Sequence, residues 1–120
     1  MTEREKVYKI RESLPTWYKV RIVRIKSDSW NWIRGSSRCY GDPQVTIGIP
    51  AEKHMSNFHW SIAASYLLHE AGHMAGTDFE RQAWSNGAKI MRKVKIFPMA
   101  FKVLKADCLR LYQKRAPHLL

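Results

Sequence analysis

The chain has little cysteine. Two occur among its 120 residues, Cys39 and Cys108, and neither belongs to a Cys-x-x-Cys pair. A cysteine content this low argues against a secreted scaffold built on disulfides, and without such a pair zinc-ribbon and thioredoxin-type functions have no support. We therefore expect both residues to be ordinary thiols in a reducing compartment.

Long apolar runs are missing as well. No stretch approaches the roughly 18 to 20 apolar residues of a membrane-spanning helix, and residues 1–13 lack the apolar centre of a secretory signal. Six glycines, five prolines and no internal period are unlike a disordered, collagen-like or repeat chain. With 45% hydrophobic and 26% charged residues, the composition predicts one globular domain over residues 1–120, cytoplasmic and away from membranes.

Acidic residues are few, since ten Asp and Glu stand against 21 Lys and Arg, for a net charge of +11. The excess is uneven: residues 1–38 carry ten basic and four acidic side chains, residues 39–80 one and five, and residues 81–120 ten and one. Such basic flanks attract nucleic acid or acidic proteins through a long-range field, although a solubilising surface explains them equally well. No pattern in the sequence indicates an oligomeric state.

Four segments show the apolar spacing of helices. Thr2, followed three residues later by Glu5, forms a capping-box pattern, and Gly76 supplies a helix stop. The expected helices run from Thr2 to Pro15, over residues 57–75, from Thr77 or Asp78 to about Lys95, and onward from Pro98.

Strand-like segments lie between the first two helices. Residues 17–26, WYKVRIVRIK, are rich in β-branched and aromatic residues and predict one strand. Residues 44–50, QVTIGIP, alternate apolar with smaller or polar residues and predict the clearest strand. A second short strand is expected near residues 30–33 or residues 38–40. The order of elements predicts an α+β fold with a two- or three-stranded sheet.

Residues 67–84, LLHEAGHMAGTDFERQAW, carry the chemistry. They include His69-Glu70-Ala71-Gly72-His73, an H-E-x-x-H pattern on an expected helix. Four residues of helix advance about 6 Å and turn about 400°, so both imidazoles stand on one face and can converge on one ion. Glu70, one step round the helix, can reach a water on that ion without ligating it. The pattern therefore predicts a metal site.

The segment resembles the active-site helix of zincin metallopeptidases and, more loosely, the small intracellular ImmA/IrrE or SprT-like kind. The resemblance covers residues 67–84. It implies that His69 and His73 ligate Zn²⁺, that Glu70 is the general base, and that a third ligand follows along the chain. It also implies a protein or peptide substrate and a minimal zincin-like fold, in which a small sheet packs on the active-site helix.

Two carboxylates compete for the third ligand position. Glu80 is preferred because E-R-Q-A-W resembles the start of the helix that supplies a glutamate ligand in gluzincin-like small peptidases. Asp78 is the alternative, since a carboxylate two residues earlier can also fold back after Gly76. Both also suit a helix N-terminus, where the macrodipole favours negative charge. The segment resembles the metzincin motif too, but Phe79 stands where that motif has its third histidine, which excludes a simple metzincin.

These features predict a zinc-dependent hydrolase, because two imidazoles and one carboxylate leave a fourth position for water. By resemblance, residues 45–49 are the edge strand that holds the substrate. The alternative is a basic nucleic-acid-binding or adaptor module whose metal site is incidental or structural, and the two functions can coexist. The same chemistry can also cleave a bond other than a peptide.

Overall fold

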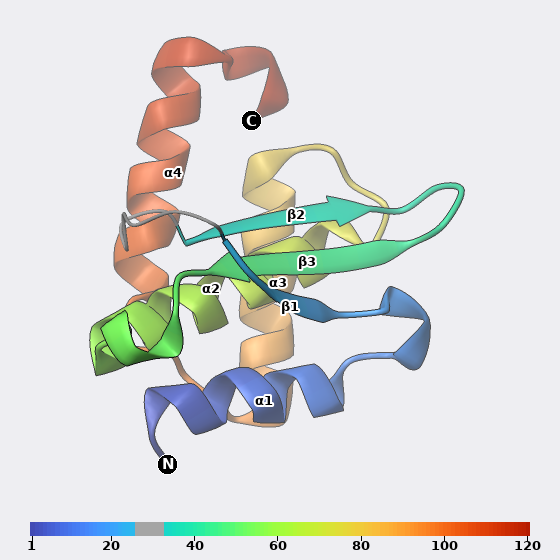
Figure 1. Cartoon of the computed structure of the whole chain (residues 1–120). Coiled ribbons are helices and arrows are strands. Elements are labelled where there is room, and N and C mark those ends of the chain that lie inside the picture. Colours follow the sequence, from blue (N-terminus) through green and yellow to red (C-terminus); the bar gives the residue numbers. More distant parts are fainter. Residues whose placement is uncertain (26–32) are drawn as a thin grey trace.

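The computed structural model describes residues 1–25 and 33–120, which form an α+β fold with four α-helices and a three-stranded mixed sheet. This class is the one that the sequence predicts. The helices are α1 (Glu3–Ser13), α2 (Asn57–His73), α3 (Glu80–Val94) and α4 (Phe101–Arg115). The strands are β1 (Arg21–Arg24), β2 (Arg34–Arg38) and β3 (Gln44–Ile49) (Figure 1). No helix in these ranges has the length and apolar content needed to cross a bilayer.

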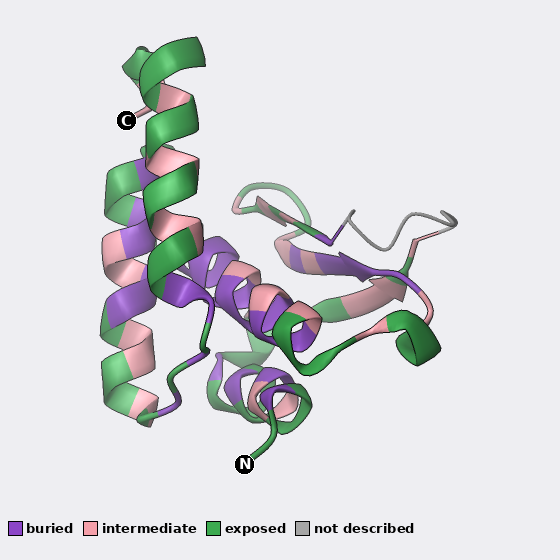
Figure 2. Ribbon diagram, turned by 90° about the vertical axis from the view of Figure 1, so that its left-hand side faces the viewer, coloured by how far each residue is buried: buried purple, intermediate pink, exposed green. Residues whose placement is uncertain are grey.

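Helix α2 is the centre of the packing. It contacts β2 and β3 on one side and α3 and α4 on the other, and α1 lies along it (Figures 1 and 2). Six of its apolar side chains are almost fully buried because neighbours surround them on several sides. These residues are Trp60, Ala63, Ala64, Leu67, Leu68 and Ala71. Burial on this scale is the largest favourable contribution to folding, and it fixes the helix that carries His69 and His73.

The sheet has the order β1-β3-β2, with β1 parallel and β2 antiparallel to β3. Val45 and Ile47 are fully buried on the inner face, in keeping with the alternation in the sequence. Strand β3 is hydrogen-bonded on both sides, so the expectation that residues 45–49 form an edge strand is wrong. The edges are β1 and β2.

The other strands differ from the sequence expectation. Residues 16–18 form a 3-10 turn, and Lys19 adopts a left-handed conformation with φ of 48°, so the first strand begins at Arg21 rather than at Trp17. Strand β2 overlaps the second expected position only at Arg38, since residues 39–40 are not strand. In the first expected position, Ile33 is not strand and residues 30–32 lie outside the described residues. Its sequence, RGSSR, has low β propensity, and pairing with β3 outweighs that preference.

The helix boundaries follow the capping signals in part. Thr2 and Glu5 form the expected capping box at α1, and Gly76, with φ of +95°, follows the end of α2. Helix α3 begins at Glu80 without a side-chain cap, so the expectation that Thr77 or Asp78 caps it is wrong. The last helix begins at Phe101 rather than at Pro98.

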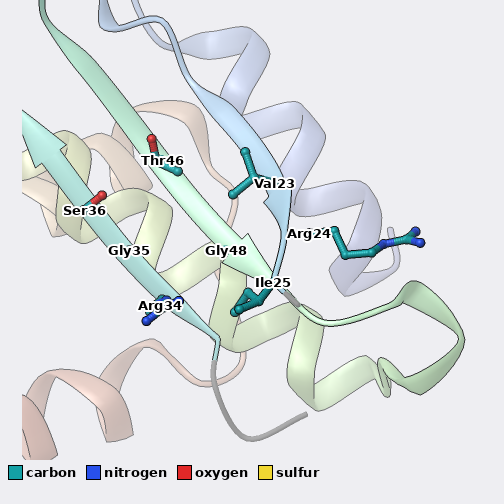
Figure 3. Close-up of a pocket in the computed structure, with 8 residues that line it drawn as sticks. All are labelled: Val23, Arg24, Ile25, Arg34, Gly35, Ser36, Thr46 and Gly48. Carbon is teal, nitrogen blue, oxygen red and sulfur yellow. The ribbon is translucent and has the colours of Figure 1, made fainter. Parts of the chain in front are cut away.

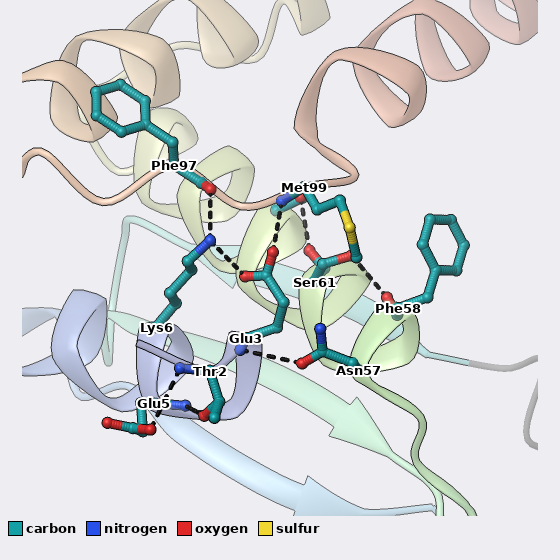
Figure 4. A network of polar contacts seen from close by, with 10 residues as sticks. Thr2, Glu3, Glu5, Lys6, Asn57, Phe58, Ser61, Phe97 and Met99 are labelled. Carbon is teal, nitrogen blue, oxygen red and sulfur yellow. Dashed lines mark hydrogen bonds and ion pairs between the residues drawn. The ribbon is translucent and has the colours of Figure 1, made fainter.

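Glu3 ties the start of the chain to the connection between α3 and α4. Its buried carboxylate accepts a hydrogen bond from the Met99 backbone N–H at 2.9 Å and pairs with Lys6 Nζ at 2.9 Å. Lys6 Nζ in turn donates to the Phe97 carbonyl oxygen, and the Glu3 backbone N–H donates to Asn57 Oδ1 (Figure 4). This network holds α1, the start of α2 and the connection between α3 and α4 together.

Helices α2 and α3 approach very closely where they cross. A Cβ added to Gly72 would lie 1.9 Å from the Ala83 carbonyl oxygen, and one added to Gly87 would lie 2.7 Å from the Leu68 carbonyl oxygen. Asn86 Nδ2 donates to the Gly72 carbonyl oxygen at 3.0 Å in the same contact. The crossing brings the first turn of α3 beside the last turn of α2.

Replacement of Gly72 by alanine should therefore force the two helices apart. We expect Gly72→Ala to lower the free energy of unfolding by about 1–3 kcal/mol, as overpacking does, in urea denaturation. Gly41→Asn is the control, because a Cβ added at Gly41 would meet no non-neighbouring atom within 4 Å in the described residues, and Asn tolerates the positive φ. Equal stability of Gly72→Ala and the control would contradict the close-approach argument.

Candidate metal centre

His69 and His73 stand one turn apart at the end of α2 and meet the same carboxylate. Their ring centroids are 4.6 Å apart. His69 Nε2 lies 2.9 Å from Oε2 of Glu80, and His73 Nε2 lies 3.3 Å from Oε1 of the same side chain. The α2–α3 crossing thus brings together the three residues that the sequence assigns to one ion.

The two imidazoles have different surroundings. His73 Nδ1 lies 2.9 Å from the Thr77 carbonyl oxygen, so it carries a proton that it donates there, and Nε2 faces Glu80. A backbone carbonyl in this role orients metal-ligating histidines in general. His69 is buried and stacks on Trp84, with ring centroids 4.2 Å apart, and its Nδ1 has no hydrogen-bond partner among the described residues.

Glu80 is a buried carboxylate held between the imidazoles. Burial raises the pKa of its carboxyl group, but hydrogen bonds from His69 and His73 outweigh burial and bring the pKa to about 2. Burial lowers the pKa of His73, and the hydrogen bonds to Glu80 and Thr77 outweigh it, so this pKa lies above its ordinary value of 6.5. Glu80 and His73 thus each favour the charged form of the other.

Asp78, the alternative third ligand, is placed differently. Asp78 is exposed to solvent, whereas only 6% of the surface of Glu80 is exposed. Asp78 and Thr77 line an open cleft beside the end of α2, while Glu80 faces both imidazoles. The structure brings Glu80, and not Asp78, to the histidine pair.

Glu70 points from α2 toward β2. Its Oε1 accepts a hydrogen bond from Ser37 Oγ at 2.8 Å, and the carboxylate is close enough to His73 to help raise the pKa of that imidazole. Gly35 makes room for the side chain, since an added Cβ would lie 2.8 Å from Glu70 Cγ. Neither Ser37 nor Gly35 was a sequence candidate, because nothing in RGSSR fixes which strand lies over the helix.

An open cleft of about 630 Å³ leads to this end of α2. Glu70 and His73 line it on the helix side, and residues 36–40 line it on the side of β2. Thr77 and Asp78 complete the wall. A ligand in the cleft therefore meets the Glu70 carboxylate and one of the two imidazoles.

Helix α4 brings two more residues that sequence reasoning did not assign to the site. Cys108 Sγ lies 3.8 Å from Oε2 of Glu80, and Tyr112, one turn later, has its pKa raised by burial and by the Glu80 carboxylate. Burial and Glu80 raise the pKa of the Cys108 thiol, while the Trp84 N–H lowers it. The only sequence signal was that Cys108 falls on the same face as Phe101, Leu104 and Tyr112.

The separations between the donor atoms can be compared with those around a tetrahedral metal. With bonds of about 2.0–2.1 Å to nitrogen and oxygen and about 2.3 Å to sulfur, zinc keeps its ligand atoms about 3.3–3.6 Å apart. The separations here are 2.9 and 3.3 Å from imidazole to carboxylate and 3.8 Å from thiol to carboxylate. In the described residues, the group whose donor atoms all lie within 4.8 Å of one another consists of His69, Glu80 and Cys108 and does not include His73.

No family model, curated protein or solved structure matches this chain. The function therefore has to be argued from the side chains and their geometry.

The pairing of Glu80 with the imidazoles predicts a pH-dependent stability in chelator-treated protein. The contribution of Glu80 is complete above its ordinary pKa of 4.5 and is lost as the pH falls toward about 2. The contribution of His73 is complete below 6.5 and is lost as the pH rises through the raised pKa. Urea denaturation should show wild type more stable than Glu80→Gln by about 2 kcal/mol between these limits. A margin that does not change with pH would contradict the pairing.

Proposed function

We propose that the protein is a zinc metallopeptidase in which His69, His73 and Glu80 hold the metal and Glu70 is the general base. The observation that carries the proposal is the convergence of both imidazoles on one buried carboxylate, beside a second carboxylate that faces an open cleft. Nitrogen and carboxylate donors in this number are the set found in catalytic zinc sites. A minimal zincin-like domain over residues 1–120 and a cytoplasmic location belong to the same proposal.

Each side chain has a distinct task. A bound zinc ion supplies Lewis acidity, which acidifies water and polarises a carbonyl group. Glu70 takes a proton at a carboxylate oxygen and later returns it to the leaving amine. Ser37 positions Glu70 by its hydrogen bond, and Thr77 fixes the ring of His73. Both are positioning residues, because neither would touch the substrate's reacting atoms.

Strand β2 is the edge that we propose for the substrate. It pairs with β3 on one side, and Ser36, Ser37 and Arg38 line the cleft that contains Glu70. A peptide added along an edge strand forms main-chain hydrogen bonds that depend little on its sequence. This arrangement gives β2 the role that the sequence resemblance assigned to residues 45–49.

The proposal predicts that Glu70→Gln keeps the metal and loses hydrolysis. Metal analysis should find one zinc per chain in wild type and in Glu70→Gln, while cleavage of a peptide library should fall by about 10²–10⁴-fold in the variant and vanish with a chelator. Asp78→Asn is the matched control, because it removes a carboxylate from the same cleft without touching the imidazole pair. Wild-type protein purified without metal, and unable to bind added zinc, would contradict the proposal. A metal-loaded protein that hydrolyses another ester or amide, and no peptide, would retain the site and change the substrate.

A second candidate function is nucleic-acid binding at the outer face of the sheet. Arg21 and Arg34 are exposed there, and no ion pair joins either to a carboxylate in the described ranges. A shallow hollow of about 470 Å³ lies on this face, with Arg34, Ser36 and Thr46 around it, while Arg24 points away (Figure 3). Unpaired guanidinium groups next to hydroxyl groups suit a phosphate backbone.

This function predicts salt-dependent binding that does not need the metal site. The double variant Arg21→Ala/Arg34→Ala should reduce the slope of log affinity against log salt by about 2, since each phosphate contact contributes about 0.9. Lys9→Ala/Lys53→Ala removes the same charge from other surfaces and is the control. Equal loss of binding in both variants would show that net charge, and not the outer face of the sheet, attracts nucleic acid. Binding of acidic protein but not of nucleic acid would contradict this function.

A further inference from the structure

We propose that Cys108 is a fourth, displaceable ligand that closes the metal site. The inference rests on the proposed zinc site and concerns its regulation. Cys108 Sγ and His69 Nε2 approach the same oxygen of Glu80, at 3.8 and 2.9 Å. These three donors form a compact group in which His69 and Glu80 are buried. His73 meets the other oxygen of Glu80 at 3.3 Å and is the fourth donor of this proposal, outside the group of three whose donor atoms all lie within 4.8 Å of one another.

Four protein donors saturate a tetrahedral zinc ion, whereas three leave a position for water. Thiolate is a strong zinc ligand, so the Cys108 sulfur, 3.8 Å from Oε2 of Glu80, competes for the open position. Coordination replaces the S–H bond with a sulfur–metal bond and releases the proton to solvent, with no change in oxidation state. The closed form holds the metal and lacks the free position that hydrolysis needs.

The position of Cys108 on α4 makes the ligand displaceable. Phe101 is the only buried residue of this helix, and it packs against Trp84 with ring centroids 5.3 Å apart. The rest of α4 is intermediate or exposed, as the pink and green helix in Figure 2 shows. An element with so few buried side chains opens at low free energy. Helix α4 can therefore withdraw the sulfur while the buried α2–α3 contact keeps the other ligands together.

Cys108 and the substrate cleft lie on different sides of the proposed metal site. Glu70 and His73 line the cleft from α2, facing β2, and Cys108 is not among the residues around it. Closure by the thiolate thus occupies a coordination position and leaves the substrate cleft unchanged. The buried indole N–H of Trp84 has no nitrogen or oxygen acceptor among the described residues, and it lowers the pKa of the Cys108 thiol.

Cobalt substitution tests the ligand directly. Wild-type protein loaded with Co²⁺ should show sulfur-to-cobalt charge-transfer absorption in the near ultraviolet. Cys108→Ala should bind one Co²⁺ without that absorption. Cys39→Ala removes the other thiol of the chain, which contacts the His73 carbonyl oxygen, and should retain the absorption. In wild type, zinc should also protect Cys108 from alkylation more than Cys39, a readout that needs no variant.

Turnover then separates a displaceable ligand from a permanent one. If about a tenth of wild-type molecules are open, Cys108→Ala should raise peptide hydrolysis about tenfold and keep one zinc per chain. A Cys108→Ala protein that folds but no longer holds zinc would make Cys108 a structural ligand and overturn the inference. Cobalt binding by wild type without the sulfur band would also overturn it, while leaving the proposed function intact. Failure of wild type to bind either metal would defeat the proposed function itself.

Discussion

Helices α2 and α3 cross at Gly72 and Gly87, where no side chain separates the two backbones. This contact determines the distance between the last turn of α2, which carries His69 and His73, and the first turn of α3, which carries Glu80. A larger residue at either glycine would move the carboxylate away from the imidazoles. The proposed metal centre thus depends on a packing constraint between backbones before it depends on the ligands. Burial of α2 against the sheet and α1 keeps that constraint rigid.

Much of the fold could be predicted because its signals are local. The capping box of Thr2 and Glu5, the stop at Gly76 and the alternation of residues 44–50 each act within a few residues, and each element formed as expected. The spacing of His69 and His73 is likewise a property of one helix. Such features need no knowledge of tertiary contacts, and for that reason a single sequence suffices.

The rest could not be predicted because it depends on pairing between distant segments. Nothing local in RGSSR indicates a strand, and β2 exists through its hydrogen bonds with β3, which also turn β3 from the expected edge into the centre. Cys108 showed no ligand spacing, because it reaches Glu80 only through the packing of α4. The choice between Asp78 and Glu80 likewise depends on which one the helix crossing directs inward. In our proposal Glu80 and Cys108, rather than the H-E-x-x-H motif, determine whether the metal keeps a free coordination position.

We propose that one metal ion binds between the histidine pair and Glu80. Anomalous diffraction from crystals of the zinc-loaded protein, recorded on both sides of the zinc absorption edge, tests this most directly. We expect a single strong peak within bonding distance of His69 Nε2, His73 Nε2 and a carboxylate oxygen of Glu80. The absence of a peak there, with the Glu80 hydrogen bonds to both imidazoles intact, would contradict it.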